Sequence, residues 1–182
     1  MPDLHVSKPA PDEYASYFGR YIDLVPDGDI VATLAAQMPA SLEALRAISE
    51  TDSLKRYAPG KWSIRELAGH ISDTERIFAY RALRFSRNDQ TPLPGFDQDP
   101  YIAAAQFDQR PWRDILEELE AVRRSTVLMF RGMNEEAWKR QGISNDNKMS
   151  VRAAAYIIAG HEIHHMNVLR EKYLSLHAKS SQ

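Results

Sequence analysis

The chain has 182 residues, of which 43% are hydrophobic and 26% charged, and its formal net charge is −2. This length and composition fit one soluble globular domain, and no basic excess points to nucleic acid. There is no cysteine, which excludes disulfides, thiolate metal ligands and a cysteine nucleophile. No apolar signal core and no stretch of roughly 18 apolar residues is found, so we expect a cytoplasmic protein with no membrane contact.

Apolar residues recur mainly at helical spacing along the chain. In chain order, the sequence predicts helices over residues 13–24, 30–49, 64–87, 111–131, 134–139 and 151–173. Strand patterns are nearly absent, so residues 141–149 are expected to form a polar loop. Residues 91–101 contain Pro, Gly and aromatic residues and are expected to form a long ordered crossover. Four long helices with one longer connection predict an all-α four-helix bundle.

Local signals mark the helix starts. Asp29 and Ser150 are candidate N-caps, because their side chains can accept free backbone N–H groups. Ser63 and Glu66 form the S-x-x-E capping box. Pro39 falls inside the first long helix and is expected to kink or split it.

Two histidines of the last helix, His161 and His165, lie in the middle of its apolar face. A buried imidazole without a partner costs roughly 1–3 kcal/mol, whereas residues at i and i+4 can share one metal ion. The alternative is a pair of core histidines bonded to backbone or to carboxylates. His70, at the edge of the buried stripe of the second long helix, can supply a third nitrogen. Three nitrogens with an open position are typical of catalytic metals; His164 lies at the edge of the same face.

Residues 161–165 also match H-E-x-x-H, the zinc-protease motif in which Glu162 would be the general base. The absence of strand patterns leaves no sheet edge for an extended peptide, and only 17 residues follow His165. We therefore disfavour a protease, and interpret Glu162 as a solvated helix residue or a group supporting the metal ligands.

Four arginines of the second long helix, Arg76, Arg81, Arg84 and Arg87, could meet an anionic substrate. The preferred interpretation is a solvated helix face with partners at i and i+4. Asp97, in the crossover, is interpreted as a turn cap or as support for the site.

Three segments resemble the DinB-like superfamily, close to its YfiT-like branch of metal-dependent hydrolases: WSIRELAGHISDTERIFAYRALRF (62–85), TPLPGFDQDPY (91–101) and SVRAAAYIIAGHEIHHMNVLREKYL (150–174). The resemblance implies an up-up-down-down four-helix bundle with a long crossover, and homodimers. It also implies a divalent metal on three histidines, at positions that fall on His70, His161 and His165. We expect residues 29–176 to form this domain, with 1–28 as an irregular extension packed on it and 177–182 as a tail.

Relatives in the superfamily include enzymes that transfer bacillithiol, mycothiol or glutathione to electrophiles. The leading hypothesis is therefore metal-dependent transfer of a low-molecular-weight thiol to a small-molecule electrophile. The alternative is a metal-dependent hydrolase with a metal-bound hydroxide, in which Glu162 or Asp73 assists as a catalytic residue. A third hypothesis is a non-catalytic metal-binding stress protein, marked by a closed site. Zinc or nickel is the expected metal, with iron, manganese or copper as alternatives.

Overall fold

The computed structural model describes residues 6–174, so the expected tail at 177–182, like His5 and His177, lies outside the described part. The long helices are α2 (Ile30–Arg46), α3 (Ile64–Ser86), α5 (Trp112–Arg131) and α7 (Val151–Val168). Shorter helices are α1 (Gly19–Ile22), α4 (Gln98–Ala105) and α6 (Glu135–Lys139), and two strands are β1 (Gln141–Ser144) and β2 (Asn147–Ser150). Single 3-10 turns cover Pro11–Glu13, Ser16–Phe18, Asp52–Leu54 and Phe107–Gln109, and π-helical turns Leu169–Leu174 extend α7.

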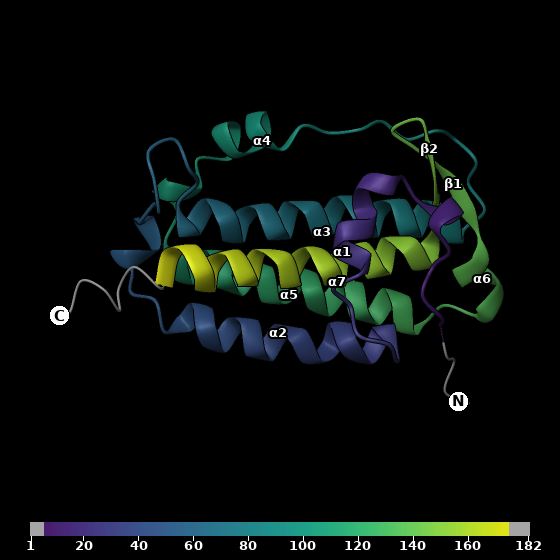
Figure 1. Ribbon diagram of the computed structural model, residues 1–182, viewed down its shortest axis with the longest axis horizontal. Coiled ribbons are helices and arrows are strands. Elements are labelled where there is room, and N and C mark those ends of the chain that lie inside the picture. The colour runs from purple at the N-terminus through teal and green to yellow at the C-terminus, as the bar shows by residue number, and fades with distance from the viewer. Residues whose placement is uncertain (1–5, 175–182) are drawn as a thin grey trace.

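The four long helices form the expected all-α bundle (Figure 1). α2 and α7 run in one direction and α3 and α5 in the other. In chain order the directions are therefore down-up-up-down, so the consecutive helices that run parallel are α3 and α5. This differs from the expected up-up-down-down order, in which α2 would run parallel to α3 and α5 parallel to α7. The reason is the crossover, which carries the chain back along the whole bundle, so that α5 starts at the same end as α3 (Figure 1).

The predicted helix starts are confirmed. The Asp29 side chain accepts the Val31 N–H at 2.8 Å, Ser63 and Glu66 form the reciprocal capping box, and Ser150 caps α7 through the Ala153 N–H. Pro39 does not split α2, which runs without interruption from residue 30 to residue 46.

A β-hairpin replaces the polar loop expected at residues 141–149. β1 and β2 pair antiparallel, and the turn residues Asn145 and Asp146 have φ of 50° and 58°. Two such residues match the left-handed turn that two-residue hairpin loops require. Leu93 of the crossover bonds to the hairpin through the Ile143 carbonyl and the Asn145 N–H, each at 2.9 Å. The hairpin therefore ties down the crossover where it passes over α3.

The apolar core is divided into two clusters, one toward each end of the bundle. One contains Ile30, Phe85 and Phe130, and the other contains Leu45 and Trp112. The middle of the bundle holds buried polar residues of all four long helices: Ser41, His70, Glu75, Arg123, His161 and Glu162. We call this set the polar layer.

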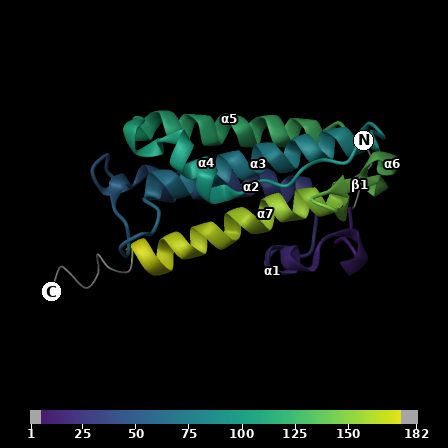
Figure 2. The same cartoon turned by 90° about the horizontal axis from the view of Figure 1, so that it is seen from above.

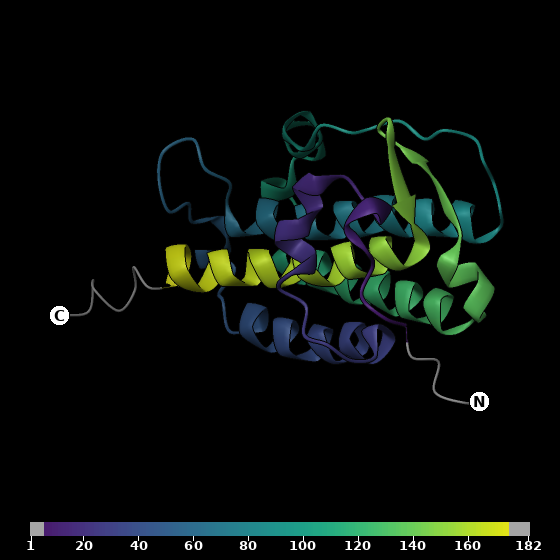
Figure 3. The same cartoon turned by 45° about the vertical axis from the view of Figure 1, so that its right-hand side comes forward.

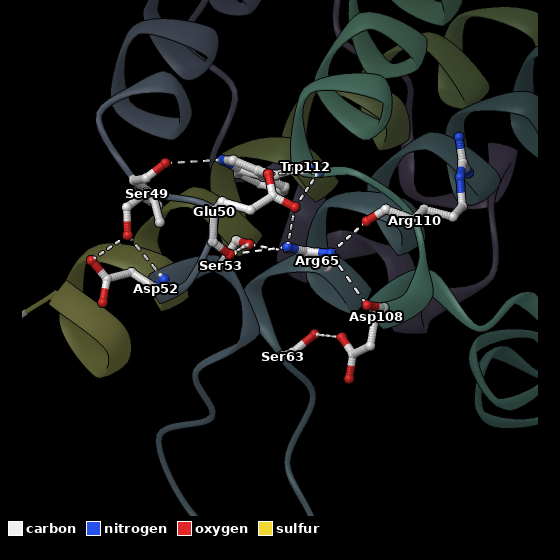
Figure 4. Close-up of polar contacts among 10 residues, drawn as sticks. Ser49, Glu50, Asp52, Ser53, Ser63, Arg65, Asp108, Arg110 and Trp112 are labelled. Carbon is white, nitrogen blue, oxygen red and sulfur yellow. Dashed lines mark hydrogen bonds and ion pairs between the residues drawn. The ribbon is translucent and has the colours of Figure 1, made fainter.

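A second polar cluster closes the end of the bundle opposite the hairpin (Figure 4). Arg65, 4% exposed, donates to Ser53 Oγ at 2.8 Å and to the backbone carbonyls of Glu50, Asp108 and Arg110. One guanidinium thus joins the loop before α3 to the segment that leads into α5, which fixes the start of α3.

Candidate metal centre

The three predicted ligands meet where α3 crosses α7. His161 Nε2 lies 3.0 Å from His70 Nε2 and 3.0 Å from His165 Nε2. The ligand atoms of all three residues lie within 4.8 Å of one another, and His70 and His161 are buried. The structure therefore brings the three imidazoles to one point, as the sequence predicted.

The donor set suits a divalent cation. One ring nitrogen either donates or accepts a hydrogen bond, so His161 Nε2 cannot form linear hydrogen bonds to both neighbours. His165 Nδ1 is buried without a hydrogen-bond partner. Zinc–imidazole bonds of about 2.0–2.1 Å in a tetrahedron need nitrogen separations of about 3.3 Å, close to the two separations of 3.0 Å that His161 makes with His70 and His165. A cation between the rings would satisfy all three nitrogens.

All three imidazoles are held neutral. Burial, with a further effect of His164, lowers the pKa of His70 to about 4. Burial and the neighbouring His70 and His164 lower the pKa of His165 to about 2. Burial also holds the pKa of His161 well below its ordinary value. Neutral imidazole is the form that binds a metal.

Aromatic rings surround the cluster. The Trp62 ring centroid lies 4.8 Å from that of His70, and the Tyr21 centroid lies 5.3 Å from that of His161. His164 contacts Tyr21 and His165 edge-on and is not among the converging nitrogens. Neither Tyr21, which lies in the irregular extension, nor Trp62 was predicted from the sequence as part of the site.

Gly160 allows the N-terminal segment to reach the site. A Cβ at this position would collide with the backbone carbonyl of Tyr21. α1 therefore packs directly on α7 (Figure 3), and this close approach places the Tyr21 ring beside His161.

A cavity of about 550 Å³ adjoins the cluster and is lined by both His70 and His161. Its other walls come from the N-terminal segment, α3, the crossover, the hairpin and α7, including Phe18, Thr74, Phe78, Phe96, Asp97, Gln98, Asn145 and Asn147. Thr74 Oγ1 also lies 3.4 Å from His70 Nδ1. The cluster is therefore open on one side to a space that can hold a small molecule.

The two predicted catalytic carboxylates lie elsewhere. Glu162 is buried in the polar layer, where Ser41 Oγ donates to it at 2.5 Å and Arg123 Nη1 lies 2.6 Å away. The interpretation of Glu162 as a solvated residue is therefore wrong. Asp73 is half-buried near Arg76 Nη1, at 3.6 Å, and burial raises its pKa. Neither carboxylate lines the cavity.

Comparison with known proteins identifies the family. The profile of the DinB superfamily matches residues 33–169, and the chain belongs to this superfamily. A relative in Oceanobacillus iheyensis, OB0413, is named provisionally as a metal-dependent hydrolase. It is 28% identical over 127 residues, which cover 68% of this chain and 72% of that protein.

Solved structures share the fold at low identity. YfiT from Bacillus subtilis, described as a probable metal-dependent hydrolase with an unusual four-helix bundle topology, has a TM-score of 0.69 at 15% identity and 93% coverage of both chains. A mycothiol-dependent maleylpyruvate isomerase has a TM-score of 0.65 at 11% identity, with 80% of this chain matching 61% of that one. Within residues 6–174, no helix combines the length and apolar character needed to cross a membrane.

Proposed function

We propose that this protein is a metal-dependent enzyme that transfers a low-molecular-weight thiol to a small electrophile, with one divalent ion held by His70, His161 and His165. The observation that carries the proposal is the convergence of three imidazole nitrogens beside a cavity of about 550 Å³. Zinc and nickel suit three nitrogen donors, and iron, manganese and copper are the alternatives.

When bound to three neutral ligands, a divalent ion keeps its double positive charge and makes it easier for a nearby thiol or water to lose a proton. The chain has no cysteine, so a thiol must arrive as a cosubstrate. The mycothiol-dependent isomerase among the structural neighbours supports this choice of nucleophile. A reducing cytosol supplies such thiols, so the proposal includes the cytoplasmic location.

The residues of the chain orient the ligands and bind the electrophile. Trp62 and Tyr21 pack against the imidazoles of His70 and His161 and shield them from water. The apolar rings of Phe78 and Phe96 offer a wall for an organic substrate. Asp97 is the carboxylate in the cavity lining, and in this proposal it accepts the proton released in the reaction.

Hydrolysis is the second candidate, favoured by the names of OB0413 and YfiT. The two reactions use the same ligands and differ in the nucleophile. A non-catalytic metal-binding role is disfavoured for two reasons. The cluster adjoins a cavity, and neither His164 nor Glu162 belongs to the cluster as a fourth ligand. The expected homodimer stays a prediction that sedimentation equilibrium can test.

Metal analysis of the purified protein tests the first step. The wild type is expected to hold one divalent ion per chain and the His161→Ala/His165→Ala variant almost none. Equal metal contents would remove the basis of the proposal. Turnover of electrophiles with a thiol panel tests the second step, and full activity without added thiol would replace the transferase with the hydrolase.

Three carboxylate variants test the proton acceptor. Asp97→Asn is expected to lower kcat by at least tenfold, within the range of general-base effects, while Asp73→Asn changes it by less than threefold. The prediction that Glu162 or Asp73 assists catalysis gains support only if its Gln or Asn variant loses kcat with the fold and metal content intact.

A further inference from the structure

Arg81 differs from the other arginines of α3 in its partners: Arg65 is as deeply buried but pairs with Glu50. Arg81 is only 4% exposed, and among the described residues its one hydrogen bond runs from Nη2 to the Pro94 carbonyl at 3.0 Å. Within residues 6–174, no carboxylate lies within ion-pairing distance of it. By contrast, Arg76 pairs with Glu118 at 2.6 Å. A buried guanidinium has five N–H donors and is costly without a counter-charge.

The electrostatic evidence agrees with this difference. Burial lowers the pKa of Arg81, because nothing nearby compensates its charge. For Arg123, burial also acts to lower the pKa, but the carboxylates of Glu75 and Glu162 outweigh it and raise the value. Arg81 is therefore a buried cation whose surroundings favour the binding of an anion.

Arg81 lines a second cavity, of about 270 Å³, between α3 and the crossover. The lining contains two arginines and no carboxylate, and its remaining side chains are aromatic or apolar: Ile77, Tyr80, Leu93, Pro94, Phe96 and Tyr101. The side chains favour an organic anion with a flat apolar body, since carboxylate matches the guanidinium fork and aromatic faces contact planar groups.

The two cavities follow one face of α3. Arg81 is 11 residues beyond His70, which is about three helical turns and about 16 Å along the axis, so both side chains leave α3 on the same side. Phe96 lines both cavities. Phe78 lines the cavity beside the histidines, and the Arg81 guanidinium lies 4.9 Å from the centroid of its ring. The crossover runs along this face of α3 (Figure 2).

We propose that Arg81 binds the carboxylate of an elongated substrate or thiol cosubstrate whose reactive end reaches the His70 and His161 cavity. The placement of the reactive end at the His70 and His161 cavity rests on the proposed function. The carboxylate site does not, because it is defined by Arg81 and its own cavity. The ligand would lie along α3 beneath Phe96.

Benzoate is the probe for the carboxylate site, with uncharged benzamide as its isostere and inorganic phosphate as a competing anion. Full-length, zinc-loaded and chelator-treated protein is titrated and followed by amide NMR shifts at Ile77, Gly95 and Phe96. We expect benzoate to bind with the same affinity in both samples and at least tenfold more tightly than benzamide. Arg81→Met should weaken benzoate at least tenfold, as charge-assisted hydrogen bonds imply.

The matched control is Arg84→Met, which removes the same charge from the same helix where Asp89 already pairs with it. It should change benzoate affinity less than twofold. Equal losses in both variants, equal binding of benzamide, or the absence of shifts in the wild type would overturn the proposal. Tighter binding of phosphate than of benzoate would refute the carboxylate assignment. If Arg81→Met fails to fold, the wild-type comparison of the three probes decides.

Failure here is distinguishable from failure of the proposed function. Benzoate binding that needs Arg81, in a wild-type protein that takes up no divalent metal when metal is supplied, would keep the carboxylate site and reject the enzyme. Metal binding by a protein that does not bind benzoate would reject the carboxylate site and keep the proposed enzyme. For any active substrate found, Arg81→Met should raise KM at least tenfold for the carboxylate form, with a smaller effect on its amide.

Discussion

The Arg123 guanidinium lies 2.6 Å from Glu162, on the helix turn that also presents His161 to the candidate metal. On its other side Arg123 forms a bidentate pair with Glu75, at 2.8–3.1 Å. Both carboxylates and the guanidinium are at most 2% exposed. Two carboxylates thus share one buried cation in the same layer as the histidines.

Arg123→Met should be among the most destabilising single changes in the protein. It leaves Glu75 and Glu162 buried without a counter-charge, which costs about 3–5 kcal/mol. Glu162→Gln should lower the free energy of unfolding by less, about 1–3 kcal/mol. Arg123 would still pair with Glu75, and the Ser41 hydroxyl could still donate to the side-chain amide oxygen at position 162. Urea unfolding of both variants measures the order. A more damaging Glu162→Gln, or a neutral Arg123→Met, would show that the network does not stabilise the bundle.

Removal of the metal should lower the thermal stability of the wild type. An ion that binds only the folded chain raises its unfolding free energy by about 2.7 kcal/mol at 100 times its Kd. The chelator EDTA should therefore lower Tm by several degrees in the wild type and leave the Tm of His161→Ala/His165→Ala unchanged. Scanning calorimetry before and after metal is restored measures both. The same shift in both proteins would mean that EDTA acts elsewhere.

Gly160→Ala should displace the N-terminal segment. Alanine favours a helix interior by about 1 kcal/mol over glycine, so α7 alone would gain stability. The added methyl group collides with the Tyr21 carbonyl, and we expect a net loss of Tm and faster proteolysis before residue 30. Ala159→Gly, one position earlier in the same buried helix, is the control for a general effect. A Gly160→Ala protein as stable and resistant as the wild type would contradict the close approach of α1.

Acid should release the start of the chain from α7. Burial acts to raise the pKa of Glu13, but hydrogen bonds from Arg152, Ser150 and the Ala10 backbone outweigh it, so the folded pKa lies below 4.5. The stabilisation is therefore complete above pH 4.5 and is lost as the pH falls through the lower folded value. Glu13→Gln should be less stable than the wild type at pH 7 and approach it below pH 4. A difference independent of pH would exclude ionisation of Glu13 as the cause.

The sequence was sufficient for the four long helices and for the histidine cluster because both depend on local spacing, but it did not predict α4, and the helix expected over residues 13–24 is limited to α1 beside two 3-10 turns. His161 and His165 share a face at i and i+4, and Ser63 with Glu66 marks the start of α3 without reference to the rest of the fold. Of the kink or split expected at Pro39, the split does not occur, because α2 continues through this residue. The hairpin was missed because its strands have four residues each, although Asn145 and Asp146 carried the signal of a tight turn.

Other features depend on contacts between distant segments. Arg76, Arg81, Arg84 and Arg87 look equivalent as a helical series. Only packing reveals that Glu118 of α5 pairs with Arg76 and that the crossover buries Arg81 without an acid. The position of Glu162 could not be found either, since its partner Arg123 is far away in the sequence.

The polar layer also restricts how the helices can slide along one another. A shift of α7 by one turn, about 5.4 Å, would separate Glu162 from both Arg123 and Ser41 and leave all three groups buried without partners. Apolar contacts alone tolerate such a shift much better, since one leucine replaces another. Axial slippage between α7 and its neighbours is therefore opposed at the level of His161, so these ion pairs also hold His161 and His165 of α7 at a fixed height relative to His70 of α3.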